Sequence, residues 1–102
     1  MSTRATYQFI TDYSNVTCYI HHDGYPSGAA CYLEGANTVE KFIRKNENAE
    51  ITLSHESHAD TEYRYTVFRG TMIQVMSRRP FTSDEWIEES YGQLADFVGG
   101  VK

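Results

Sequence analysis

The stretch from Val16 to Pro26 constrains the fold most, because it holds a strand, a forced turn and a helix start in direct succession. Val16 to His22 alternate β-branched and aromatic residues in period two, the pattern of a half-buried strand. Asp23-Gly24 interrupt this pattern, and Gly24 admits a positive φ. Pro26 needs no amide donor and has its φ fixed near the helical value, so a helix can begin there.

A second strand is expected before this stretch, from Ala5 to Thr11, where apolar and polar residues alternate. The polar residues of Asp12 to Asn15 are typical of a short hairpin connection. The two strands should therefore pair antiparallel. In the strand from Val16 to His22, alternation separates two sets of residues. One set is expected to face the core and consists of Val16, Cys18, Ile20 and His22. The other set consists of Thr17, Tyr19 and His21.

Two helical segments or one bent helix should follow the turn, since apolar residues recur there at three- and four-residue spacing. Gly35 weakens the middle of the segment, and Asn37 followed by Glu40 resembles a helix-start capping arrangement. Ala49 to Asp60 is interpreted as loop, although Ile51-Thr52-Leu53 also fits a short strand or a turn of helix.

A second hairpin is predicted from Glu62 to Phe68 and from Thr71 to Ser77, because Arg69-Gly70 between them is the two-residue connection that a tight turn prefers. Arg78, Arg79 and Pro80 are expected to close the sheet.

A last helix is predicted to begin at Thr82, which forms a capping box with Glu85. An apolar stripe at helical spacing follows: Ile87, Tyr91, Leu94 and Val98.

The order β-β-α-β-β-α predicts a two-layer α+β sandwich, with an antiparallel sheet of about four strands and helices on one face. With 102 residues, the chain is expected to be a single domain spanning residues 1–102. The other sheet face stays partly open. Tyr63 and Tyr65 share one side of their strand, so they either expose an aromatic surface for a partner or belong to the core.

The net charge and the cysteine content limit the possible partners and the cellular location of the chain. The net charge of −5 makes nucleic acid an unlikely partner, because such binding needs clustered Lys and Arg. Cys18 and Cys31 lie on different expected elements and fit separate buried thiols in a reducing cytosol. The N-terminus, Met1 to Tyr7, lacks an apolar leader, and no run is long enough to span a membrane. A cytoplasmic location is expected.

The four histidines fall in two clusters, each with an aspartate: His21-His22-Asp23, and His55, His58 and Asp60. If the segments met, they would offer imidazole and carboxylate ligands for zinc, manganese or iron. Alternation would direct His21 and His22 to opposite faces, so one at most could join a site. A divalent metal held by His22 (or His21), Asp23, His55 and His58 is the alternative to hydrogen-bonding histidines without a cofactor.

The segment from Gly24 to Gly28 enters a helix, where free amides could hold a phosphate. The simpler interpretation is a turn in which the Asp23 carboxylate caps the helix. Neither cysteine has a sequence-local activator, and nucleophile-elbow, phosphate-loop and dinucleotide motifs are absent, so no catalytic residue is assigned.

Three segments, Thr3 to Phe9 (TRATYQF), His21 to Pro26 (HHDGYP) and Asp60 to Tyr65 (DTEYRY), resemble a family of small uncharacterised proteins of phages, prophages and bacteria. The resemblance spans most of the chain and transfers no activity. It implies a context in which small acidic proteins are often inhibitors of host systems, including anti-CRISPR and other anti-defence proteins.

The leading hypothesis is therefore a small cytosolic binding protein that inhibits or sequesters a protein or a small ligand. The resemblance implies that it is phage-derived, and a phage-encoded chain would be located in the cytosol of the host. The alternatives are a metal-binding protein or small metal-dependent hydrolase, and a protein that sequesters a nucleotide or another phosphorylated ligand. The residues expected to bind are His21, His22, Asp23, Gly24, Tyr25, Tyr63 and Tyr65.

Overall fold

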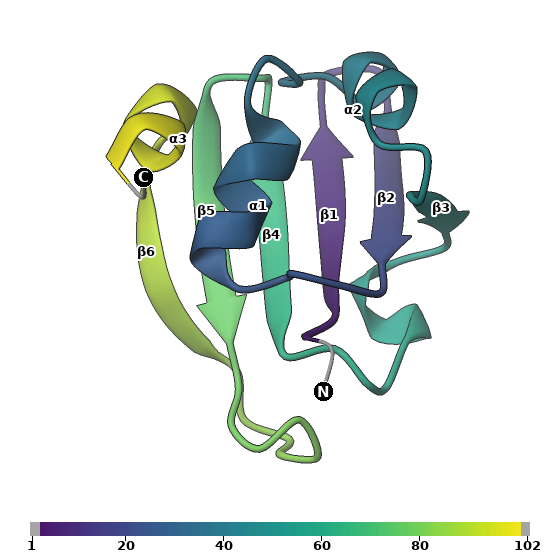
Figure 1. The fold of residues 1–102 in the computed structure, drawn as a ribbon, viewed down its shortest axis with the longest axis vertical. Helices are drawn as coiled ribbons and strands as arrows, with labels where there is room; N and C mark the ends of the chain where they lie inside the picture. The colour runs from purple at the N-terminus through teal and green to yellow at the C-terminus, as the bar shows by residue number, and fades with distance from the viewer. Residues whose placement is uncertain (1–2, 101–102) are drawn as a thin grey trace.

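A six-stranded mixed sheet carries the fold in the computed structural model, which describes residues 3–100 (Figure 1). The order across the sheet is β3-β2-β1-β4-β5-β6. Only β1 and β4 run parallel, and every other neighbouring pair is antiparallel. The strands are β1 (Ala5–Ile10), β2 (Asn15–Ile20), β3 (Glu50–Thr52), β4 (Tyr63–Phe68), β5 (Met72–Ser77) and β6 (Ile87–Gln93).

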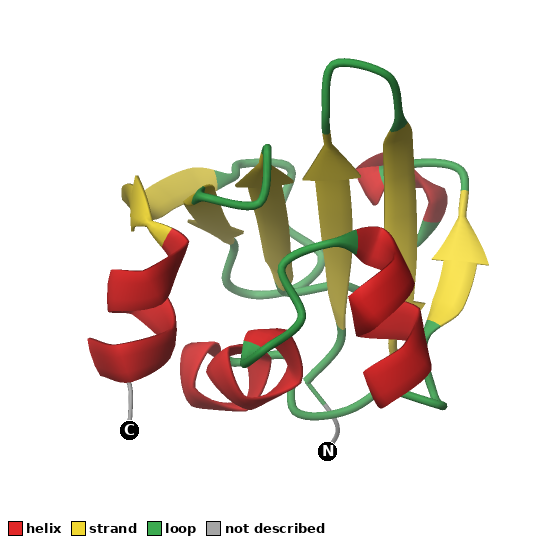
Figure 2. Cartoon of the chain, turned by 90° about the horizontal axis from the view of Figure 1, so that it is seen from above, coloured by secondary structure: helices red, strands yellow, loops and turns green. Residues whose placement is uncertain are grey.

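Three α-helices lie on one face of the sheet, α1 (Pro26–Leu33), α2 (Val39–Lys45) and α3 (Leu94–Gly100), and the short 3-10 turn η1 (His55–Ser57) lies on the other (Figure 2). The α+β class with helices on one face is confirmed. The expected antiparallel sheet of about four strands is wrong, since the sheet has six strands and one parallel pair. Among residues 3–100, no helix has the length and apolar character needed to cross a membrane. The expectation that the N-terminal segment lacks an apolar leader includes Met1 and Ser2, which lie outside the described residues.

The helical region after the turn consists of two separate helices, which resolves the alternative left open by the sequence. Gly35 adopts a φ of +69° after α1, a backbone conformation that favours glycine. Thr38, and not Asn37, is the N-cap of α2, and its side chain accepts a hydrogen bond from the amide of Lys41. Lys45 joins the two helices, because its Nζ donates to the backbone carbonyls of Cys31 at 2.5 Å and Glu34 at 2.7 Å.

The predicted last helix is mostly a strand. Ile87–Gln93 forms β6, which pairs antiparallel with β5, and only Leu94–Gly100 is helical. Pairing satisfies backbone groups at the outer edge of β5, and Gly92 is a poor helix residue. Arg78 to Pro80 therefore do not close the sheet, but start the loop that leads to β6.

The interval from Ala49 to Asp60, interpreted as loop, contains β3 and η1. After β3 at the sheet edge, the chain crosses the open face at η1 and returns to the centre beside β1. The amide of Glu62 donates to the carbonyl of Arg4 at 2.9 Å, so β4 starts at the same end as β1 and runs parallel to it.

Both predicted hairpins are confirmed. β1 pairs antiparallel with β2, and β4 pairs antiparallel with β5. Arg69 and Gly70 have φ values of +52° and +69°, as a type I′ turn requires of both central residues.

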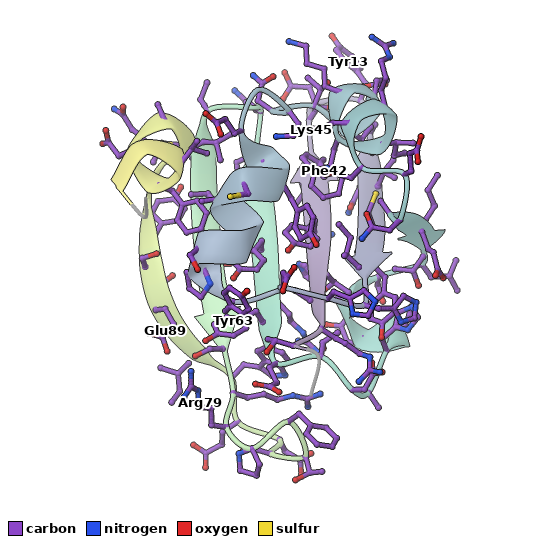
Figure 3. All side chains as sticks on the ribbon, in the orientation of Figure 1. Tyr13, Phe42, Lys45, Tyr63, Arg79 and Glu89 are labelled. Carbon is purple, nitrogen blue, oxygen red and sulfur yellow. The ribbon has the colours of Figure 1, made fainter. Side chains whose placement is uncertain are left out.

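A row of aromatic rings forms the core between the sheet and the helices. Tyr7 stacks on Tyr65 with ring centroids 5.1 Å apart, and the ring centroid of Phe42 lies 5.0 Å from that of Tyr7. Figure 3 labels Phe42, which comes from α2. Tyr65 is fully buried and Tyr63 is 6% exposed. These two tyrosines therefore belong to the core and do not form an exposed aromatic surface.

Candidate functional site

The turn between β2 and α1 is the candidate site, and its backbone differs from a simple helix cap. Tyr25 is the N-cap residue of α1 and makes no capping hydrogen bond with its side chain. The simpler interpretation of the sequence, in which the carboxylate of Asp23 caps the helix, is wrong. That carboxylate accepts a hydrogen bond from the phenol of Tyr25 at 3.0 Å. Asp23 itself adopts a φ of +55°, which is uncommon for a residue with a side chain.

Three hydrogen bonds hold the backbone of this turn. The amide of Gly24 donates to the carbonyl of Thr3 at 2.9 Å, and the buried hydroxyl of Tyr65 donates to the carbonyl of Gly24 at 2.5 Å. The hydroxyl of Tyr32 donates to the carbonyl of His22 at 3.2 Å. Because these contacts come from the segment before β1, from β4 and from α1, the surrounding structure over-determines the turn.

Close packing leaves no room for a side chain at Gly24. A Cβ there would lie 2.7 Å from the Cβ of Ala5 and 3.0 Å from two backbone atoms. Gly24 thus contributes to the site by allowing the turn to touch β1.

Three side chains of the turn reach solvent: His22, Asp23 and Tyr25, the last of them 42% exposed. The hydrogen bond to Asp23 raises the pKa of the Tyr25 phenol. At neutral pH the turn therefore presents a carboxylate beside a phenol that stays protonated, on a backbone fixed from below.

The other predicted binding residues divide into two groups. Tyr65 supports the turn from beneath through its hydroxyl. Tyr63 is the first residue of the same strand, and its hydroxyl accepts a hydrogen bond from the guanidinium of Arg79 at 3.0 Å (Figure 3). The Nε2 of His21 lies 2.8 Å from a carboxylate oxygen of Glu50, within hydrogen-bonding distance.

The two histidine segments do meet, but they meet around a tyrosine. His58 stacks on Tyr19 with ring centroids 3.6 Å apart, and His21 contacts the same ring edge-on at 4.6 Å. The carboxylate of Asp60 accepts a hydrogen bond from the hydroxyl of Tyr19 at 2.9 Å. Burial, and then the hydrogen bond to Asp60, raise the pKa of Tyr19 to about 12.

The ligand set proposed for a metal is not assembled. His55 lies apart from the turn, with its Nδ1 2.6 Å from the hydroxyl of Thr6 and its Nε2 2.9 Å from that of Thr66. The Nε2 of His58 lies 3.1 Å from the hydroxyl of Thr52. Within the described part of the chain, no group of three His, Cys, Asp or Glu side chains is placed to hold a metal ion.

The two cysteines differ in burial. Cys18 is buried, and burial raises its pKa to about 11, whereas Cys31 is exposed. The interpretation of two buried thiols therefore holds for Cys18 only.

A matched pair of substitutions tests the support beneath the turn. Tyr65→Phe removes the hydroxyl that satisfies the carbonyl of Gly24, and should lower the free energy of unfolding by about 2 kcal/mol. Tyr7→Phe removes a buried hydroxyl that has no hydrogen-bond partner among the described residues, so stability should be unchanged or rise by up to about 1 kcal/mol. Urea unfolding of both variants measures the difference, and equal losses would contradict this account of the turn.

Sequence reasoning missed the tyrosines that organise this region: Tyr7, Tyr19 and Tyr32. Alternation placed Tyr19 on the strand face opposite the expected core, although its side chain is 2% exposed. Contacts between elements distant in sequence gave no local signal. Comparison with known proteins found no family model, no curated protein and no solved structure that matches the chain, so a function has to be inferred from the geometry of the turn.

Proposed function

We propose that the chain is a binding protein and not an enzyme, and that it holds a cationic segment of a protein partner at the turn before α1. The observation that supports this most is the φ of +55° at Asp23, inside a backbone fixed by three hydrogen bonds. A strained residue persists only where its surroundings impose it, and such residues cluster at ligand-binding positions. Here the constraint fixes the position of an exposed carboxylate.

A cationic partner fits this turn better than a phosphate does. The amide of Gly24 already donates to Thr3, and the Asp23 carboxylate lies next to the start of α1. A negative charge at that position opposes a second anion. A guanidinium or ammonium group, by contrast, would pair with the carboxylate, and the net charge of −5 would assist its approach.

The biological setting proposed for this binding is inhibition. The resemblance of the segments TRATYQF and HHDGYP to small phage proteins supports an anti-defence role, such as that of an anti-CRISPR, in the cytosol of a host cell. Host systems of this kind contain nucleic-acid-binding proteins, which present the clustered Lys and Arg that the turn would recognise.

The test is co-purification followed by binding with purified proteins. Tagged wild type should retain a host protein, identified by mass spectrometry, and Asp23→Asn should weaken the purified complex at least about tenfold. Asparagine is the best substitute, since it also tolerates a positive φ and removes only the charge. Glu47→Gln, which removes one exposed carboxylate outside the turn, is the matched control and should bind like wild type.

Equal binding by wild type and Asp23→Asn would disprove a role for the turn. Turnover of a substrate without any partner would disprove the broader proposal. Both variants need the same urea midpoint as wild type, so that a loss of binding is not a loss of folding.

A further inference from the structure

A cavity of about 800 Å³ opens at the end of the sheet opposite the candidate turn. It lies among α1, α3 and the β4–β5 connection, whereas the turn lies at the start of α1 (Figure 1). Its volume falls within the range of small-molecule sites, about 300–1,000 Å³. The proposed function does not use this cavity.

The floor of the cavity is apolar. Leu33 and Ala36 come from the end of α1 and the segment after it, and Leu94 comes from the first turn of α3. All three are buried, with exposed fractions of 5% or less. Met72 and Val98 extend this apolar lining toward the opening. A ligand there would have to present an apolar body.

Lys41 is the only charged residue among the described residues that line the cavity. This is unexpected in a chain with 14 acidic and 9 basic side chains. No hydrogen bond or ion pair engages its ammonium group within the described part of the chain. Lys45, one helical turn further on, instead has its Nζ committed to two backbone carbonyls.

We propose that this cavity binds a small amphipathic anion, whose apolar body lies against Leu33 and Leu94 and whose carboxylate pairs with Lys41. The charge of the lining selects an anion over a cation, because among the described residues one lysine lines the cavity and no acidic side chain does. The apolar floor supplies affinity, since binding removes hydrocarbon from water. The site is separate from the turn before α1 and does not depend on the function proposed for it.

Isothermal titration with decanoate, below its micelle concentration, tests the proposal. Wild type should bind one decanoate per chain and should bind decyltrimethylammonium, of the same chain length, at least about tenfold more weakly. Lys41→Gln should weaken decanoate binding about tenfold. Arg44→Gln, which removes an exposed cation of the same helix that does not line the cavity, should leave it unchanged.

A second variant separates the cavity from the surface charge. Ala95 is exposed at the rim, so Ala95→Trp should fill the cavity without disturbing the core and should abolish decanoate binding. The proposal is overturned if wild type does not bind decanoate, if Ala95→Trp binds it normally, or if Lys41→Gln and Arg44→Gln weaken it equally. Equal affinities of wild type for decanoate and for decyltrimethylammonium would overturn it as well.

Discussion

Replacing Gly28 with alanine is expected to lower the free energy of unfolding by about 3 kcal/mol, the upper end of the usual cost of overpacking. A Cβ at Gly28 would overlap the carbonyl oxygen of Asp23 and lie 2.9 Å from its carbonyl carbon. The obstacle is backbone, and that backbone is held at both Gly24 and His22 by hydrogen bonds. Neither α1 nor the turn can therefore move aside cheaply.

Gly99→Ala is the matched control. Gly99 lies in α3, and a Cβ there would meet nothing within 4 Å. Alanine is the better helix residue by up to about 1 kcal/mol, so this variant should be as stable as wild type or slightly more stable. Urea unfolding, with circular dichroism at 222 nm as the readout, compares the two. A cost below about 1 kcal/mol for Gly28→Ala would mean that the turn is much softer than its contacts imply.

The sequence specified those elements whose signals are local. Both hairpins follow from alternation and from turn residues, and the start of α1 follows from Pro26. Arg69-Gly70 illustrates why: the two-residue connection needs a positive φ at both positions, and the pattern of residues alone predicts that.

β6 was missed because two structures fit the same residues. Ile87, Tyr91, Leu94 and Val98 have helical spacing, but strand pairing depends on an unpaired edge, and here β5 offers one. An element that is stabilised by a neighbour distant in sequence cannot be identified from its own periodicity. The parallel pairing of β1 and β4 has the same origin, since it depends on how the chain returns across the open face.

The sequence predicted where the candidate site lies in the chain, but not its backbone conformation or the hydrogen bonds that hold it. The HHDGYP segment marks the turn, but the positive φ falls on Asp23 and not on Gly24, where the sequence led us to expect it. The hydroxyls of Tyr32 and Tyr65 hold that turn from α1 and β4, and nothing in their local sequence indicates this. Likewise, the spacing of the histidines gave no sign that His21 and His58 would pack on Tyr19.

Acidification is expected to destabilise the protein through His55, by up to about 3 kcal/mol between pH 7 and pH 4. Burial lowers the pKa of His55 from 6.5 to about 4, and the nearby Arg64 lowers it further, while Glu56 opposes the shift. On acidification, the His55 imidazole is therefore protonated near pH 6.5 in the unfolded chain but only near pH 4 in the folded chain. Stability contributed by this group is complete above pH 6.5 and is lost as the pH falls through that window.

The neutral ring matters because it bridges η1 to the sheet, through the hydroxyl of Thr6 on β1 and that of Thr66 on β4. Urea midpoints of wild type and His55→Gln across pH 4 to 7 isolate its contribution, since the carboxylates that titrate in the same range are common to both. The variant should be less stable than wild type at pH 7 and should approach it at pH 4. An NMR titration of the His55 ring gives an independent measurement. A midpoint near 6.5, or parallel pH profiles for the two proteins, would show that the ring is not held neutral by burial.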